Sequence, residues 1–298
     1  MNIICMSGGL GNQMFQYALY LKYRSLGIET KIEDWTEYVG RDNARPLFLK
    51  TAFGIDYPRV TLKEYHRYTD SFPGFFSKIK RKIRGRHSTE YIEASCNFDP
   101  EILKKNDTYV RGCFQSERYF KDIEEIVRKE YTFTDEVASK AAKVLIESGL
   151  SEEEARFRSQ VPYTSIHIRR GDYLTLPENY GNICTEEYYD RAIKHILSVE
   201  PHTVFLVFSN DQEWALLWAQ KYLKQGIEMI VVTGTDEDTG YIDMFIQTGC
   251  KHNIIANSSF SWWGAYLNQN DNRVVIAPSK WANHIDQRDI YSEWMTMV

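Results

Sequence analysis

The chain has 298 residues, of which 43% are hydrophobic and 26% are charged, a composition typical of a globular protein with two domains or one large one. The formal net charge of -5 does not indicate a nucleic-acid partner. No apolar run approaches the roughly 20 residues that cross a bilayer. Five cysteines at long spacings favour reduced thiols over a disulfide framework or zinc site. The first residues lack the basic segment of a signal peptide, so we expect a cytoplasmic protein.

The N-terminal segment predicts a β-loop-α-β unit. Residues 3–6 form an apolar strand, residues 7–13 a glycine-rich loop, residues 13–26 a helix and residues 28–33 a second strand. Such a loop lets a ligand approach backbone N–H groups. A nicotinamide-dinucleotide fingerprint is an alternative, although its third glycine is missing, and a tight turn without a ligand is another.

The region from residue 41 to residue 113 shows no regular pattern and predicts short helices and loops with many aromatic residues. Within it, residues 78–87 contain seven Lys, Arg or His residues, directly after a phenylalanine-rich segment. We expect residues 72–87 to form a solvated loop. The alternative is peripheral contact with the inner face of the cytoplasmic membrane, through basic residues and inserted phenylalanines.

The second half of the chain predicts a doubly wound parallel sheet. Helices are expected at residues 116–131 and 134–148, and a charged linker after them places a domain boundary between residues 155 and 156. Strands and helices then alternate. The strands are expected at residues 161–168, 203–208, 228–233, 253–257 and 274–278, and the helices at residues 185–199, 211–224, 241–248 and 259–268.

Polar residues cluster where these strands end, the edge at which open α/β sheets bind ligands. The first strand delivers His167, Arg169, Arg170 and Asp172. Arginine suits bidentate capture of phosphate, although a surface ion-pair network is an alternative. The serine-rich segment 257–264 opens a helix whose N–H groups suit a phosphate, whereas a plain serine cap is the simpler interpretation.

Three further acidic positions have two interpretations each. Asp211 is placed to cap a helix or to contact a ligand. Asp243 lies early in a helix, where carboxylates are favoured, but a carboxylate also accepts both donors of the guanine N1–H and amino edge. The triplet Asp236-Glu237-Asp238 is a D-x-D sequence that would hold Mn²⁺ or Mg²⁺ on a nucleotide sugar, or a chance acidic cluster.

Three motifs together resemble the bacterial α-1,2-fucosyltransferases of glycosyltransferase family 11. They are residues 8–18 (GGLGNQMFQYA), 167–173 (HIRRGDY) and 257–265 (NSSFSWWGA). The resemblance implies a GT-B-like fold with two Rossmann-like domains, an acceptor-side domain over residues 1–155 and a GDP-fucose-binding domain over residues 156–298. It implies inverting transfer of L-fucose from GDP-β-L-fucose to O2 of a terminal β-galactoside in glycan or surface polysaccharide synthesis, with no cofactor and no metal.

The resemblance also implies roles for individual residues. Arg169 would contact the departing β-phosphate, where a fixed cation helps most as negative charge grows. The other residues that would bind GDP-fucose are Asn12, His167, Arg170, Asp211, Asp243, Ser258, Ser259 and Phe260. A carboxylate base is expected for the acceptor hydroxyl, with Asp172 and Glu178 as candidates. For Asp172 we favour orientation of the arginines, and the base is left unassigned.

Three other functions fit parts of the sequence. A metal-dependent glycosyltransferase for another nucleotide sugar would use the D-x-D triplet. A nicotinamide oxidoreductase would use the glycine-rich loop. A carbohydrate-binding protein without activity would account for the many aromatic residues, but it would have no use for Arg169 and Arg170.

Overall fold

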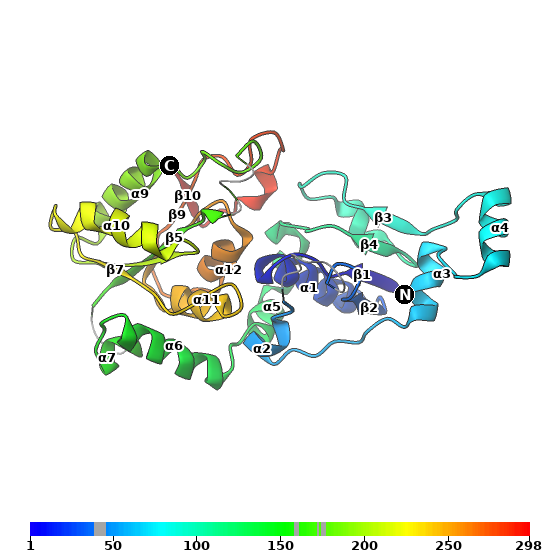
Figure 1. The fold of residues 1–298 in the computed structure, drawn as a ribbon, viewed down its shortest axis with the longest axis horizontal. Helices are drawn as coiled ribbons and strands as arrows, with labels where there is room; N and C mark the ends of the chain where they lie inside the picture. The colour runs from blue at the N-terminus through cyan, green and yellow to red at the C-terminus, as the bar shows by residue number, and fades with distance from the viewer. Residues whose placement is uncertain (39–45, 158–160, 172, 174–176) are drawn as a thin grey trace. The chain divides into compact units, whose positions relative to one another are not determined.

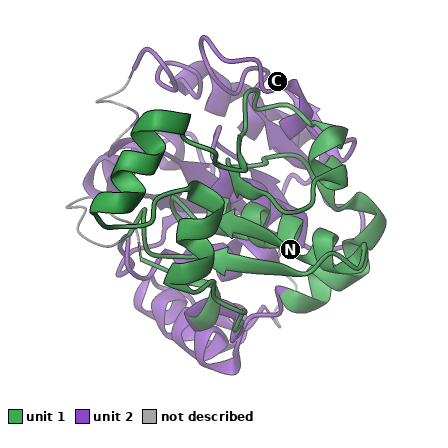
Figure 2. Cartoon of the chain, turned by 90° about the vertical axis from the view of Figure 1, so that its right-hand side faces the viewer, with its two compact units in different colours: residues 1–50, 55–130 green, residues 51–54, 131–298 purple. Residues whose placement is uncertain are grey.

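A computed structural model describes residues 1–38, 46–157, 161–171, 173 and 177–298. The chain forms two compact units, coloured separately in Figure 2. Unit 1 comprises residues 1–50 and 55–130, and unit 2 comprises residues 51–54 and 131–298. Helices α6 (Asp135–Glu147) and α7 (Glu152–Ala155) belong to unit 2, where α6 packs against a later helix of that unit. The domain boundary expected at residues 155–156 stays a prediction.

Unit 1 is built on a four-stranded parallel sheet with the strand order β2-β1-β4-β3 (Figure 1). The strands are β1 (Asn2–Cys5), β2 (Thr30–Glu33), β3 (Glu90–Ile92) and β4 (Tyr109–Arg111). Helix α1 (Leu10–Ser25) connects β1 to β2, so the predicted β-loop-α-β unit is confirmed. The short helices of this part of the chain are α2 (Leu49–Phe53), α3 (Leu62–Thr69), α4 (Phe75–Arg84) and α5 (Glu124–Glu130).

Two predictions for this region were wrong. Residues 75–84 form helix α4 rather than a loop, and glycines at positive φ bound the helix at both ends. The helix predicted at residues 116–131 is interrupted at Phe120, whose φ of -139° is not helical. The Phe120 ring is fully buried, with its centroid 6.2 Å from that of Phe15. The chain therefore forms two 3₁₀ turns (Glu117–Tyr119 and Lys121–Ile123) before α5, and a third 3₁₀ turn spans Pro100–Lys104.

Unit 2 contains a six-stranded parallel sheet with the order β10-β9-β8-β5-β6-β7. The predicted alternation of strands and helices is confirmed, and β10 is an additional strand that pairs with β9. The strands are β5 (Tyr163–Ile168), β6 (Val204–Ser209), β7 (Met229–Val231), β8 (His252–Ile254), β9 (Val275–Ala277) and β10 (Met295–Met297). The helices after β5 are α9 (Glu186–Val199), α10 (Gln212–Leu223), α11 (Gly240–Gly249) and α12 (Ser259–Leu267), and a 3₁₀ turn spans Arg288–Ile290.

The two faces of strand β5 differ in polarity, as its alternating sequence predicts. Ile166 and Ile168 join one apolar core with the buried faces of α9 and α10. On the other face, the Ser165 hydroxyl accepts a hydrogen bond from the Asn253 side chain at 2.8 Å, and Asn253 also donates to a carbonyl of α11. The apolar face anchors the strand, and the polar face leads to the side chains at its end.

No helix in the described part of the chain is long and apolar enough to cross a membrane.

Candidate active site

The sheet of unit 2 changes direction at β5. From β5 the chain adds β6 and β7 on one side and then returns to add β8, β9 and β10 on the other. The carboxyl ends of the two strands at such a reversal enclose a crevice in open α/β sheets. Here these strands are β5 and β8, and they are followed by the arginine motif and the serine motif. The topology thus brings two of the three sequence motifs to one place.

His167 is buried at the end of β5, and its ring lies 5.3 Å from that of Phe260, between centroids. Its Nδ1 atom has no hydrogen-bond partner among the described residues. Burial, with a smaller contribution from the positive charge of Arg169, lowers the pKa of His167 to about 3. The imidazole is therefore neutral at physiological pH. A buried ring nitrogen without a hydrogen-bond partner costs free energy, unless a bound ligand supplies the missing hydrogen bond.

Arg170 is held by the end of the neighbouring strand β6. Its Nε donates to a carboxylate oxygen of Asp211 at 3.0 Å, and its backbone N–H donates to the Asn210 side chain at 2.9 Å. Its guanidinium carbon also lies 4.0 Å from the ring centroid of Trp214. Asp211 at the same time caps α10, because it accepts from the Trp214 backbone N–H. Asp211 thus orients an arginine and caps a helix, and ligand contacts by either residue stay a prediction.

Gly171 is required where the chain turns away from β5. Its φ is +24°, and a Cβ atom built on it would lie 2.3 Å from the side-chain nitrogen of Asn210. Because Asn210 also holds the Arg170 backbone, a larger residue at position 171 would displace the loop that carries the arginines.

Arg169 is half-buried, with its guanidinium carbon 5.9 Å from the ring centroid of Tyr173. The Tyr173 hydroxyl donates to the backbone carbonyl of Asn257 at 2.8 Å, which ties the arginine motif to the serine motif. Asp172 lies outside the described residues. Glu178 is exposed in a turn. The identity of the base therefore stays unassigned.

The serine motif follows β8, the second of the two strands at the reversal of the sheet, and begins helix α12. Ser258 is the N-cap residue, but its side chain makes no capping hydrogen bond, and Ser259 begins the helix. The first N–H groups of a helix suit an anion because they have no partner within the helix. Phe260 packs between His167 and the first residue of α11, since a Cβ on Gly240 would lie 3.7 Å from its ring.

Asp243 lies on the first turn of α11, a helix that packs against α12. One of its carboxylate oxygens, Oδ1, is buried and has no hydrogen-bond partner among the described residues. Burial raises the pKa of Asp243 to about 7, although a hydrogen bond from the Thr235 side chain opposes the shift. An incompletely bonded carboxylate suits a ligand that offers N–H donors.

The D-x-D triplet makes a turn. The Asp236 carboxylate accepts hydrogen bonds from the backbone N–H groups of Asp238 and Thr239, both at 3.0 Å, and from the Thr239 hydroxyl at 2.7 Å. These bonds hold the pKa of Asp236 below its usual range. Among the described residues, no group of three His, Cys, Asp or Glu side chains is placed to hold a metal ion.

Asn12 belongs to unit 1, in the first turn of α1. Its side-chain oxygen accepts a hydrogen bond from the Gln115 side chain at 2.7 Å. The glycine-rich loop before it is fixed by two buried glutamines. Gln13 donates to the Gly8 carbonyl, and Gln16 accepts from the Ser7 backbone N–H. Gly8 has a φ of +74°, and a Cβ there would lie 2.6 Å from the Asn12 side chain. The loop is therefore rigidly built around Asn12.

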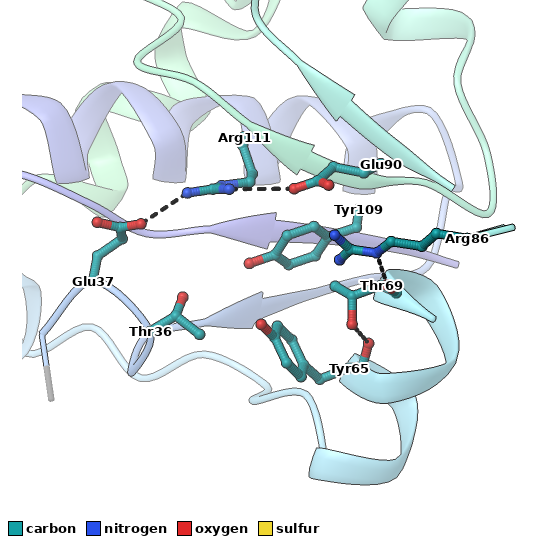
Figure 3. A pocket seen from close by; sticks show the side chains of 8 residues that line it. All are labelled: Thr36, Glu37, Tyr65, Thr69, Arg86, Glu90, Tyr109 and Arg111. Atoms are coloured by element: carbon teal, nitrogen blue, oxygen red, sulfur yellow. Dashed lines mark hydrogen bonds and ion pairs between the residues drawn. The ribbon is translucent and has the colours of Figure 1, made fainter. Parts of the chain in front are cut away.

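A polar pocket of about 250 Å³ opens elsewhere in unit 1 (Figure 3). The Arg111 guanidinium bonds Glu37 at 2.9 Å and Glu90 at 3.3 Å, and Arg86 donates to the Thr69 carbonyl at 2.8 Å. The remaining lining residues are Thr36, Tyr65 and Tyr109. Because two carboxylates balance its two guanidiniums, this pocket does not suit a diphosphate. Its hydroxyl and charged groups suit a neutral polyhydroxylated ligand.

Sequence reasoning placed Asn210 at the ligand edge of the sheet, but it missed two other residues that hold the motif side chains in place. Asn210 and Trp214 contact Arg170, and Gln115 donates to Asn12. Trp214 and Gln115 belong to no motif. The position of Trp214 beside Asp211 could have been predicted from the sequence, because an aromatic residue three positions after a capping aspartate lies on the same side of the first turn. Gln115 lies 103 residues from its partner, and no local pattern indicates that pairing.

The comparison with solved structures agrees with the predicted fold. A crystal structure of POFUT1 in complex with GDP matches 94% of this chain and 98% of that chain, with a TM-score of 0.54 and 12% sequence identity. The predicted architecture is therefore confirmed: the protein has a GT-B fold, with two units built on parallel sheets.

The chain belongs to glycosyl transferase family 11, whose model matches residues 78–297. The O-antigen biosynthesis glycosyltransferase WbnK of Escherichia coli is 30% identical over 298 residues, covering 93% of each chain. The α-1,2-colitosyltransferase of Escherichia coli is 28% identical, covering 93% of this chain and 90% of its own. The galactoside α-(1,2)-fucosyltransferase 1 of Oryctolagus cuniculus is 26% identical, covering 87% of this chain and 62% of its own. The predicted family is confirmed, and the protein is a glycosyltransferase.

Proposed function

We propose that the protein transfers L-fucose from GDP-β-L-fucose to O2 of a terminal β-galactoside, with inversion at the anomeric carbon. The observation that carries this proposal is the pair of buried, unsatisfied atoms His167 Nδ1, at the end of β5, and Asp243 Oδ1, on the first turn of α11. Buried polar atoms without partners are rare, and these two favour a ligand that supplies their missing bonds. A guanine and a sugar diphosphate provide donors and acceptors of the required kinds.

The donor residues have distinct roles in this proposal. Asp243 accepts the N1–H and amino donors of guanine. The N-terminal N–H groups of α12, with the hydroxyls of Ser258 and Ser259, bind the diphosphate. Arg169 binds the β-phosphate and offsets the charge that develops there as the glycosidic bond breaks. Arg170 is kept in place by Asp211 and Trp214 and adds positive potential to the same strand end.

The acceptor side is proposed to lie in unit 1. The pocket around Arg111 supports this assignment, because carboxylates and a guanidinium that already bond one another offer hydrogen bonds to sugar hydroxyls without attracting a phosphate. The transfer requires loss of the acceptor hydroxyl proton, and His167 is unsuited to remove it because its pKa is near 3.

GDP-colitose is a second candidate donor, favoured by the similarity to the α-1,2-colitosyltransferase. Colitose lacks the 3-hydroxyl group of L-fucose. A site that hydrogen-bonds this hydroxyl would reject the deoxy sugar, because its own polar groups would lose their partner.

The first experiment measures GDP release from GDP-L-fucose with lactose as acceptor, and then repeats the assay with GDP-colitose. We expect release that depends on the acceptor and falls by about 10² to 10³-fold in Arg169→Ala, as for the loss of one donor to a developing oxyanion. Leu217→Ser, an exposed change on α10, is the control. Full activity in Arg169→Ala would contradict the role of the arginine. A preference for GDP-colitose would reassign the donor.

A further inference from the structure

Helix α4 is not packed against the rest of unit 1. None of its ten residues is buried, and Figure 1 shows it at the end of an excursion of the chain between α3 and β3. Glycines with φ of 106° and 81° bound it, so the chain turns sharply at both ends. An isolated helix of this length is only marginally stable in water and needs a partner surface.

One side of α4 is an exposed apolar stripe made of Phe75, Phe76, Ile79 and Ile83. Their exposed fractions are 72%, 86%, 39% and 81%. At about 100° of rotation per residue, these four positions fall within an arc of about 100°. Phe72, just before the helix, is 38% exposed. Apolar side chains gathered on one exposed face indicate a surface that is covered when the protein works.

The flanks of the stripe are basic. Residues 78–87 contain six lysines and arginines, and no acidic residue occurs between residues 71 and 89. The basic positions on the helix are Lys78, Lys80, Arg81, Lys82 and Arg84. This segment is strongly cationic in a chain whose formal net charge is -5. The partner is therefore expected to be anionic at its surface and apolar just beneath it.

Asp70 lies at the start of the segment that carries α4 and bonds residues at its other end. It ends α3 in a left-handed conformation with a φ of 47°, and its carboxylate accepts from Arg84 at 3.4 Å and from the His87 backbone N–H at 2.9 Å. Arg86 donates to the Thr69 carbonyl, and Arg81 donates to the Phe72 carbonyl. These bonds attach the segment that carries α4 to the end of α3.

We propose that α4 is an interfacial helix that binds an anionic lipid bilayer, with its apolar stripe inserted among the headgroups and its basic flanks on the lipid phosphates. An amphipathic helix with lysines and arginines beside large apolar residues has this behaviour. A second copy of the chain is a poor occupant, because pairing two α4 helices would bring their like charges together. This inference is independent of the donor and acceptor assigned above.

The test is cosedimentation of the full chain with vesicles of phosphatidylcholine, with or without phosphatidylglycerol. We expect binding to the anionic vesicles that weakens as salt is added. Phe76→Ser/Ile83→Ser and Lys80→Glu/Lys82→Glu should each reduce the vesicle partition coefficient by about tenfold or more, since one basic residue alone contributes about fivefold. Transfer to a soluble acceptor should stay unchanged in both variants, which shows that they are folded.

The matched controls carry the same changes on exposed positions of unit 2. Leu217→Ser/Leu223→Ser removes two exposed apolar side chains of α10, and Lys143→Glu/Lys224→Glu reverses two exposed charges. Both should bind vesicles as the unmodified protein does. Equal losses in variants and controls would overturn the proposal, as would equal binding to vesicles with and without phosphatidylglycerol. A change in oligomeric state of the α4 variants without vesicles would assign the helix to a protein contact instead.

Discussion

The His167 ring and the Oδ1 atom of Asp243 are both buried, and burial shifts the pKa values of the two residues in opposite directions. The imidazole is kept neutral with a pKa near 3, and the carboxyl group reaches a pKa near 7. In each case burial disfavours the charged form. The free site is consequently less charged at neutral pH than its sequence suggests. A ligand that stabilises the Asp243 carboxylate would change the protonation of the site when it binds.

The pH dependence of GDP binding tests this point. A guanine that donates two N–H groups requires the ionised Asp243, which predominates only above about pH 7 in the free protein. Below that pKa, GDP affinity should fall about tenfold for each pH unit, and above it the affinity should level off. Calorimetric titration from about pH 6 to pH 8 measures the effect.

Asp243→Asn is the control for that titration, because GDP itself gains a proton on its phosphate in the same range. The variant should bind GDP more weakly at high pH and should retain only the shallow slope that the nucleotide contributes. If both proteins gave the same slope, Asp243 would not contact guanine.

For single residues, the sequence predicted to which face of a strand a side chain points. It did not predict as well which other residues that side chain contacts. The alternation in β5 correctly separated Ile166 and Ile168 from His167, because successive residues of a strand point to opposite faces. The pairing of Arg170 with Asp211 could not be predicted, since it depends on β5 and β6 being neighbours in the sheet. Such pairings come from topology, which local patterns do not encode.

At the scale of elements, the turn before α11 distinguishes between the two interpretations of the D-x-D triplet. The Asp236 carboxylate accepts hydrogen bonds from the backbone of the turn before this helix, whereas the Asp238 carboxylate accepts none from the residues that the structure describes. Asp236→Ala should lower the free energy of unfolding by about 0.5–2 kcal/mol, the cost of losing a capping side chain. Asp238→Ala should have little effect, and thermal unfolding of the two variants measures the difference.

A metal site would give another result. If the triplet held Mn²⁺ or Mg²⁺, both alanine variants would lose transfer activity, EDTA would inhibit the unmodified protein, and added metal would restore it. We expect transfer to resist EDTA and Asp238→Ala to stay active.

Elements were predicted well where hydrophobic periodicity was strong. The helices and strands from α9 to β9 lie within a few residues of their expected positions, because each carries a clear apolar face. In the region of residues 41–113, short helices were expected and occur, but the strands β3 and β4 were missed because each has only three residues. Helix α4 is exposed on every side, so its apolar stripe carries no signature of a core. The strand β10 was missed because its three residues resemble a loop.

For the molecule as a whole, the residues proposed to bind the donor and those proposed to bind the acceptor lie in different units. Unit 2 carries the proposed donor residues at the end of β5, on the first turn of α11 and at the start of α12. The order of the strands in both sheets and the change of direction at β5 appear only in three dimensions. The alternation of elements predicted the class of the second sheet but not the order of its strands.

Hydrogen exchange with and without GDP tests this division. At a hundredfold excess over the dissociation constant, GDP should stabilise the bound form by about 2.7 kcal/mol and slow exchange accordingly. Protection is expected at residues 167–171, 240–243 and 258–261 of unit 2. The pocket around Arg111 serves as the internal reference and should be unchanged. Protection concentrated there would move the nucleotide to unit 1.

The hydrogen bond from Tyr173 to Asn257 has a consequence for building hybrid enzymes. The Asn257 side chain also donates to the carbonyls of Tyr180 and Trp281, so one residue after β8 supports two loops that lie far from it in sequence. A segment exchanged between two members of the family would carry only half of this junction. Donor preference should therefore be transplanted by moving residues 163–181, 252–261 and the Trp281 loop together, because a single transplanted loop would lose the support it needs.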